Sequence, residues 1–302
     1  MSSTRDIRRR IKSINNTQQI TRAMQMVAAA KMRKAQEVAL KTRAYARRAL
    51  DLLSNLSEKT KRDLHPLLVK NEGKKVLLVL VTTDKGLCGG LNTNILNEAM
   101  KFFRTQKAEN REVDLLCVGK KSRDFMQRHG FKIIAEFLDF GDKFNLLDMT
   151  AVAQIPLKEY IQKNYHKVYL LYTDFLSTIN QKPRLRQLLP IEKSELMKLE
   201  ELGKNVEKAI GEKEKTYEYI FEPSTEGLLE ILLPRLCQMQ IFQAMLESNA
   251  SEHSARTVAM KNATDAAGDI IGDLRLTFNQ ARQAAITKEI AEISAGANLQ
   301  KS

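Results

Sequence analysis

Both ends of the chain carry a helical pattern of apolar residues. From about Ser3 to Leu64, apolar side chains recur in steps of three and four, and the first proline is Pro66. Such spacing over many turns is typical of a coiled coil, and its alanine-rich middle lets a partner helix approach closely. The stripe comprises Ile7, Ile11, Ile14, Gln18, Thr21, Gln25, Ala28, Met32, Ala35, Ala39, Thr42, Ala46, Ala49, Leu53 and Leu56.

The C-terminal stretch shows a second stripe of the same kind. It follows Pro223, and Pro234 is expected to kink or restart the helix. The polar stretch Glu247–Thr257 interrupts the apolar spacing and is its weakest part. The stripe comprises Met260, Ala263, Ala267, Ile271, Leu274, Phe278, Ala281 and Ala285, after which Ile286, Ile290 and Ile293 form a separate apolar face.

The middle of the chain has a different pattern. Short runs rich in Val, Leu and Ile alternate with helical stretches, which predicts a parallel sheet with helices on its faces. The predicted strands are Lys74–Thr83, Val113–Val118, Lys167–Thr173 and a weaker edge strand, Arg186–Ile191. The predicted helices between them are Asn92–Gln106, Ser122–His129 and Thr150–Asn164.

These patterns predict an α/β fold combined with a long coiled coil. We expect an N-terminal coiled-coil helix over residues 1–65 and a C-terminal one over 223–297. Between them, 73–215 forms a Rossmann-like parallel-sheet domain that ends in the charged stretch Glu195–Lys215. Because a compact middle domain returns the chain to its starting point, two helices of matched length can pair antiparallel.

Positive charge is concentrated at the N-terminus. The net charge is +13, and residues 1–50 hold thirteen Lys and Arg against two acids, a surplus of eleven. A basic face indicates a nucleic acid, a membrane surface or an acidic protein as partner. The first aromatic residue is Tyr45, so the interleaved aromatics that favour nucleic-acid binding are missing from the basic clusters. A basic coiled-coil protein that binds nucleic acid remains the alternative reading.

No motif in the chain predicts catalysis. The glycine-rich turn Thr82–Asn92 lies between a strand and a helix, where phosphate loops occur, but it matches neither GxGxxG nor GxxxxGK[ST]. A packing turn is favoured over a nucleotide site, with an enzyme built on this turn as the rival. The four histidines are scattered, so we expect no metal and no cofactor. Cys88, Cys117 and Cys237 lie far apart and predict free thiols in a reducing compartment.

Three segments together resemble one protein family. They are INNTQQITRAMQMVAAAKMRKAQ (Ile14–Gln36), TTDKGLCGGLN (Thr82–Asn92) and the long C-terminal segment Glu247–Ala297. Their sequences are similar, in order, to those of the ATP synthase gamma subunit family of bacteria. The resemblance implies a rotor shaft without catalytic residues, which transmits torque between a membrane c-ring and the catalytic beta subunits. It also implies alpha, beta, epsilon and c-ring partners, no nucleic acid, and a peripheral place on the cytoplasmic face of the bacterial cell membrane.

The same resemblance assigns roles to single residues. It implies contacts with the beta subunit for Met24, Arg256, Arg282, Gln283 and Thr287. An apolar bearing near the helix tip is implied for Ile286, Ile290 and Ile293, and a foot against the c-ring and epsilon for Tyr219, Phe221 and Glu222.

Overall fold

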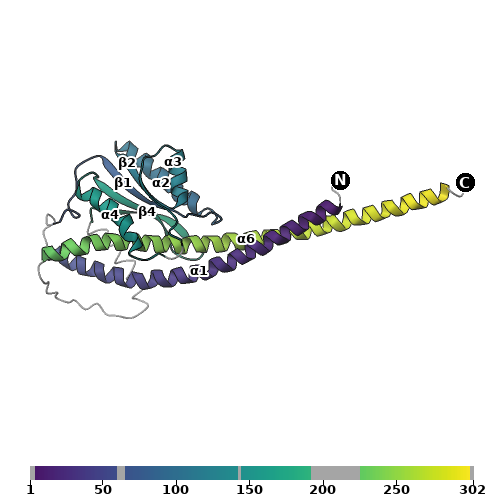
Figure 1. The fold of residues 1–302 in the computed structure, drawn as a ribbon, viewed down its shortest axis with the longest axis horizontal. Helices are drawn as coiled ribbons and strands as arrows, with labels where there is room; N and C mark the ends of the chain where they lie inside the picture. Colours follow the sequence, from purple (N-terminus) through teal and green to yellow (C-terminus); the bar gives the residue numbers. More distant parts are fainter. Residues whose placement is uncertain (1–3, 60–64, 142–143, 192–224, 300–302) are drawn as a thin grey trace. The chain divides into compact units, whose positions relative to one another are not determined.

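A computed structural model describes residues 4–59, 65–141, 144–191 and 225–299 of the chain (Figure 1). The chain divides into two compact units. The central unit is Ala30–Ala255, and the terminal unit combines Met1–Ala29 with Arg256–Ser302. Two long helices, α1 (Thr4–Lys59) and α6 (Thr225–Leu299), each contribute to both units.

The central unit contains a five-stranded sheet in the order β3-β2-β1-β4-β5. The first four strands are parallel, and β5 runs antiparallel to β4. The strands are β1 (Lys75–Val81), β2 (Glu112–Val118), β3 (Ile133–Phe137), β4 (Lys167–Phe175) and β5 (Gln181–Leu189). The connecting helices are α2 (Leu91–Ala108), α3 (Lys120–Arg128) and α4 (Asp148–Ile161). The parallel α/β prediction is confirmed, with β3 as a strand that the sequence pattern missed.

Strand β1 divides the core of the central unit into two layers. Val76, Leu78 and Leu80 pack with α2 and α3 on one face of the sheet. The alternate residues, such as Leu77 and Val79, pack with α4 and α6 on the other. Figure 1 shows the sheet between these helices. Because successive side chains of a strand point to opposite faces, a strand covered on both sides is apolar at successive positions, as β1 is from Val76 to Val81.

The first turns of α6 belong to this core. Their buried apolar residues are Leu229, Leu233, Leu236, Cys237, Ile241, Phe242, Ala244, Met245 and Leu246. Gln238 adds polar contacts to the α4 region, since its Nε2 donates to Leu146 O at 2.9 Å and to Thr150 Oγ1 at 2.5 Å. Pro234 was expected to kink or restart the helix, and the restart is wrong because α6 is one helix with Pro234 inside it. Packing on either side of the proline offsets its cost of about 3 kcal/mol.

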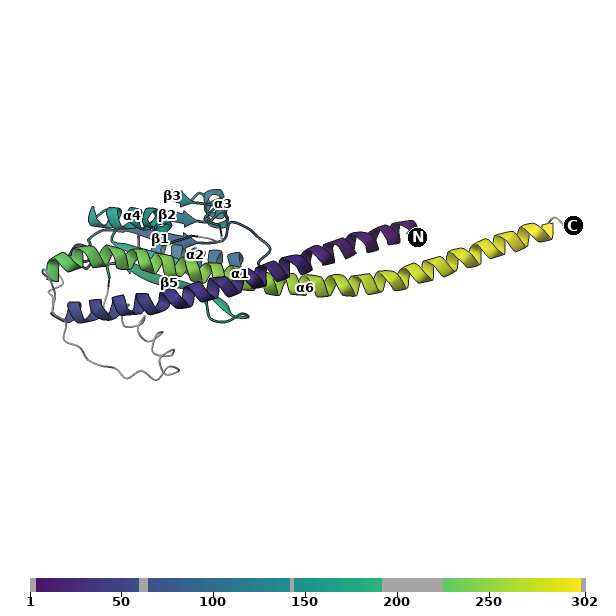
Figure 2. The ribbon, with the colours of Figure 1, turned by 60° about the horizontal axis from the view of Figure 1, so that its bottom comes forward.

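The terminal unit is an antiparallel pair of helices (Figure 2). The Arg8 guanidinium lies 5.4 Å from the centre of the Phe278 ring, while Gln18 Nε2, further along α1, donates to Thr264 O at 3.2 Å. The Thr21 and Thr264 hydroxyls hydrogen-bond at 2.8 Å. Residue numbers thus rise along α1 as they fall along α6, which confirms the antiparallel prediction. Every stripe residue of α1 from Ile7 to Ala35 is buried or half-buried.

Gly119 allows β2 to join α3 beside β1. Its φ is +95° and its ψ is 146°, a conformation found almost only in glycine. A Cβ at this position would lie 2.3 Å from Thr82 O.

We expect Gly119→Ala to lower the free energy of unfolding of the chain by about 2–4 kcal/mol, since it adds a backbone clash to the unfavourable φ. Gly130→Ala is the matched control, because Gly130 has a φ of +72° but open space around its Cβ position. Its cost should be about 1 kcal/mol, from the left-handed backbone alone. Urea unfolding followed by circular dichroism measures both, and equal losses would contradict the clash.

Candidate interaction surface on the terminal helices

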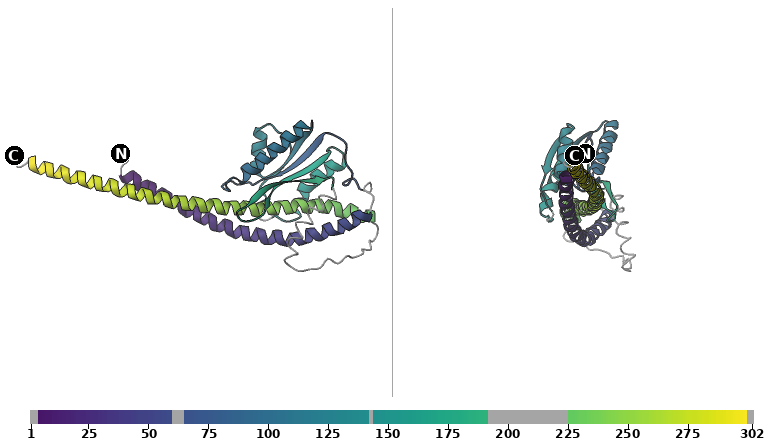
Figure 3. Two further views of the ribbon diagram at one scale, coloured as in Figure 1. Left: turned by 180° about the vertical axis from the view of Figure 1, so that it is seen from behind. Right: turned by 90° about the vertical axis from the view of Figure 1, so that its right-hand side faces the viewer.

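The tip of α6 extends beyond the start of α1. The pairing contact nearest this end joins Arg8 to Phe278, and α1 begins only four residues before Arg8, at Thr4. All residues from Arg282 to Ser294 are accordingly exposed. Figure 3 shows the last turns of α6 continuing past the N-terminal end of α1. The tip is therefore a single helix that presents its whole circumference.

The structure places six residues that the resemblance singled out on this tip. Ile286, Ile290 and Ile293 lie on one face of α6 and are 47%, 60% and 66% exposed. Arg282, Gln283 and Thr287 are exposed around the same turns, and the Thr287 hydroxyl donates to Gln283 O at 3.0 Å. Three large apolar side chains exposed in a row make this face a candidate for contact with another protein.

Ala285 departs from the sequence prediction. It was assigned to the helix–helix seam, but it is exposed. The half-buried seam ends at Ala281 because α1 does not reach further along α6. The spacing of apolar residues along α6 alone carries no information about where its partner helix begins.

The remaining predicted contact residues fall in different places. Met24 on α1 and Arg256 on α6 are both half-buried in the terminal unit. The positive charges at the start of α1 lie on its surface, where Arg9, Arg10 and Lys12 are exposed. The foot residues Tyr219, Phe221 and Glu222 lie outside the described part of the chain.

The polar side chains of the glycine-rich turn in the central unit form hydrogen bonds with other groups of the same chain. Asp84 Oδ1 accepts from Lys120 N at 3.0 Å, and Thr82 Oγ1 accepts from Ser122 N at 2.8 Å. Amides at the start of α3, which would otherwise attract an anion, are therefore capped from within the chain. Asn92 closes the turn, since its Nδ2 donates to Thr83 Oγ1 at 2.8 Å.

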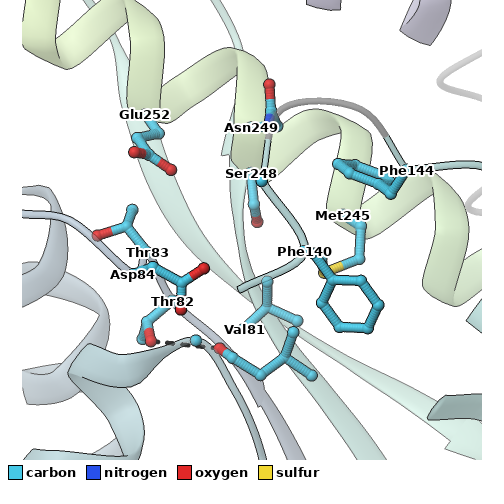
Figure 4. Close-up of a pocket in the computed structure, with 13 residues that line it drawn as sticks. Val81, Thr82, Thr83, Asp84, Phe140, Phe144, Met245, Ser248, Asn249 and Glu252 are labelled. Atoms are coloured by element: carbon cyan, nitrogen blue, oxygen red, sulfur yellow. Dashed lines mark hydrogen bonds between the residues drawn. The ribbon is translucent and has the colours of Figure 1, made fainter. Parts of the chain in front are cut away.

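A small pocket lies at the carboxyl ends of β1 and β2, where α/β folds often bind ligands (Figure 4). Thr82, Thr83 and Asp84 form one side, while Met245, Ser248 and Glu252 of α6 form another. Its volume is about 40 Å³. Ligand sites usually measure about 300–1,000 Å³, so this space fits a water molecule and not a nucleotide.

The sequence analysis missed one set of polar residues. Ser248, Ser251 and Ser254 lie on α6 at intervals of three, and each contacts the end of β4 or the turn after it. Their stretch was interpreted as a weak part of the helix seam. A serine repeated every third residue on a helix is the signal that could have indicated a polar contact with a neighbouring element.

All three cysteines are buried thiols. Burial raises the pKa of Cys117 to about 11 and that of Cys237 to about 12. Cys88 is buried too, and its sulfur accepts from Asn92 Nδ2 at 3.3 Å.

Two kinds of feature are absent from the described ranges. No three His, Cys, Asp or Glu side chains come together there as a metal-binding group. No helix in the same ranges is long and apolar enough to cross a membrane.

Comparison with known proteins identifies the family. A family model described as ATP synthase matches residues 3–298. The ATP synthase gamma chain of Herpetosiphon aurantiacus is 44% identical over 306 residues, covering 98% of each chain. That of Pelotomaculum thermopropionicum is 45% identical over 297 residues, covering 98% of this chain and 99% of its own. The chain therefore belongs to the ATP synthase gamma chain family.

Solved structures give the same fold. A chain from the central stalk and c-ring of Tetrahymena thermophila mitochondrial ATP synthase is 26% identical, with a TM-score of 0.57 over 81% of this chain and 99% of that one. A chain of the Euglena gracilis mitochondrial enzyme is 22% identical, with a TM-score of 0.66 over 98% of this chain and 94% of that one.

We expect the thiols of Cys117 and Cys237 to resist alkylation in the folded chain. At pH 8 a pKa of about 11 leaves about a hundredfold less thiolate at Cys117 than the unperturbed thiol pKa of 9.0 would. Reaction with iodoacetamide followed by peptide mass spectrometry measures this, and the same chain in guanidinium chloride is the control, where both thiols should react fully. Rapid labelling of the folded chain at pH 8 would show that these side chains are accessible.

Proposed function

We propose that this chain is the central rotor shaft of an ATP synthase. It transmits torque between a membrane c-ring and the catalytic beta subunits, and so couples proton or sodium-ion flow to ATP synthesis and hydrolysis. Membership of the gamma chain family supports this role, as does the similarity to the Tetrahymena chain, which comes from the central stalk and c-ring of an ATP synthase.

The observation that carries the proposal is the construction of α6. Its first turns are buried in the central unit, its middle pairs with α1 in the terminal unit, and its tip is exposed. Because one 75-residue helix includes all three parts, a force applied to the sheet reaches the tip through continuous backbone hydrogen bonds.

The tip is the part that we assign to the catalytic ring. Arg282, Gln283 and Thr287 would hydrogen-bond a loop of a beta subunit, while Ile286, Ile290 and Ile293 would form an apolar bearing. Their exposure supports both roles, since no part of α1 between Thr4 and Lys59 covers them. Exposed charge pairs are individually weak, which suits contacts that must form and release as the shaft turns.

Met24 and Arg256 are proposed to face the lever region of beta, and both are half-buried beside the helix seam. The foot residues Tyr219, Phe221 and Glu222 stay a prediction for contact with the c-ring and epsilon. In the same proposal the chain is non-catalytic, ATP chemistry takes place in the beta subunits, and the complex lies on the cytoplasmic face of a bacterial cell membrane.

The two rival functions lack comparable support. The family relatives give no indication of a nucleic-acid-binding protein. An enzyme built on Thr82–Asn92 would need room for a substrate, and the pocket beside that turn measures about 40 Å³.

We expect Arg282→Ala and Gln283→Ala each to lower ATP-driven ion pumping several-fold in a complex whose gamma subunit is this chain. Each change removes a hydrogen bond to the ring, and each 1.36 kcal/mol of lost stabilisation is about tenfold in rate. Pumping into inverted membrane vesicles is compared with ATP hydrolysis in the same preparation.

Lys288→Ala is the matched control for this pair of changes. Lys288 is another exposed cation of the tip, and its pair with Glu292, at 3.5 Å, is exposed. Its loss should change pumping less than twofold. A complex that lacks the chain entirely should not pump, and pumping without it would refute the shaft.

We also expect Ile290→Asp to reduce rotation-dependent ATP hydrolysis, since a carboxylate would be buried in the apolar bearing. Ala284→Asp adds the same charge to the opposite side of the tip, where Ala284 is exposed. Hydrolysis should fall more for Ile290→Asp at equal subunit composition. Equal activities would show that the isoleucine face does not bear on the ring.

A further inference from the structure

The polar stretch that interrupts the apolar pattern of α6 lies against the sheet. Ser248, Ser251 and Ser254 follow one another at intervals of three and face β4 and the turn after it. We name these three residues the serine ladder. Ser251 and Ser254 are 0% and 1% exposed, so the ladder is largely interior.

Each serine of the ladder bonds to backbone outside its own helix. Ser248 Oγ accepts from Thr173 N at 3.2 Å, and Ser251 Oγ donates to Thr173 O at 3.3 Å. Ser254 Oγ donates to Thr178 O at 2.7 Å and accepts from Gln181 Nε2 at 3.4 Å. Serines inside helices commonly hydrogen-bond to the carbonyl one turn earlier. Three successive serines that bond to another element instead form a specific polar contact between α6 and that element.

The ladder consists of hydrogen bonds, whereas the preceding part of α6 contacts the sheet through apolar packing. Between Leu229 and Leu246, α6 packs through apolar side chains, and such packing is non-directional. A hydrogen bond weakens steeply when its geometry is disturbed. Rotation of α6 about its own axis would therefore break the hydrogen bonds of the ladder in addition to disturbing the apolar packing.

The position of the ladder also fits a load-bearing contact. Ser254 lies directly before Ala255, the last residue of the central unit, and α6 enters the terminal unit at Arg256. The ladder thus lies at the end of the part of α6 that belongs to the central unit.

We propose that the serine ladder fixes the rotational setting of α6 on the sheet and carries twisting load between them. Ser248, Ser251 and Ser254 are positioning residues in this role. The inference rests on the proposed shaft function, because only a rotating part experiences such a load.

The test is the triple variant Ser248→Ala, Ser251→Ala, Ser254→Ala in a complex whose gamma subunit is this chain. Initial rates of ATP-driven pumping and of ATP hydrolysis are measured in vesicles, first with no ion gradient and then against an imposed opposing gradient. Without a gradient the variant should pump and hydrolyse as the unchanged chain does. Against a full gradient we expect about threefold less pumping per ATP hydrolysed, because the contact between α6 and the sheet yields under load when the serine hydroxyls are missing.

Ile241→Val is the control for a general loss of packing. Ile241 is buried in the apolar face of α6, and its shortening weakens the core without removing a directional contact. It should leave the pumping ratio unchanged at every gradient. Hydrogen exchange of the Thr173 amide gives an independent reading, and only the triple variant should accelerate it.

Three results would overturn the proposal that the serine ladder carries load. They are a ratio that falls equally with and without the gradient, a ratio that never falls, and an Ile241→Val variant that matches the triple variant. A failure of the shaft function itself looks different, since a complex that lacks the chain would then pump as well as a complex that contains it.

Discussion

The burial of the first turns of α6 is the interaction on which the structure depends. Between Leu229 and Leu246 the helix covers one face of the sheet, and each large apolar side chain buried there contributes about 1.5–3 kcal/mol. Several such contributions exceed the cost of a proline within the helix, so α6 continues through Pro234. Without this anchor, one face of the sheet would lose its apolar cover.

The same anchor explains why the space at the carboxyl ends of the strands is small. In folds of this kind, ligands enter the crevice beyond the carboxyl ends of the strands. Here α6 supplies Met245, Ser248 and Glu252 to the space at that edge, and the turn after β1 caps the start of α3 with Asp84. A fold common among ligand-binding proteins is used here to hold a helix.

Local periodicity made much of the fold predictable. The stripe from Ile7 to Ala35 and the continuous apolar run of β1 are local signals, and both correspond to buried faces. Strand β3 was missed because it has five residues, none fully buried, and an irregular register with β2. The exposure of Ala285 was missed because it depends on where a different helix begins.

The candidate surface was predictable only in part, for a similar reason. Its residues were assigned through resemblance, and the structure adds that Arg282, Gln283 and the three tip isoleucines are exposed on one unpaired stretch of helix. The serine contacts were not foreseen, because a polar stretch in a helical pattern reads as a defect until the neighbouring strand is known.

The unequal reach of the two long helices has a consequence of its own. A two-helix rod resists bending better than a lone helix, so within the terminal unit α6 should be stiffer where it pairs with α1 than beyond Ala281. Any thermal flexing of the axle should thus concentrate in its final turns. A flexible helix tip can adjust its position within a close-fitting surrounding surface that is not perfectly symmetrical.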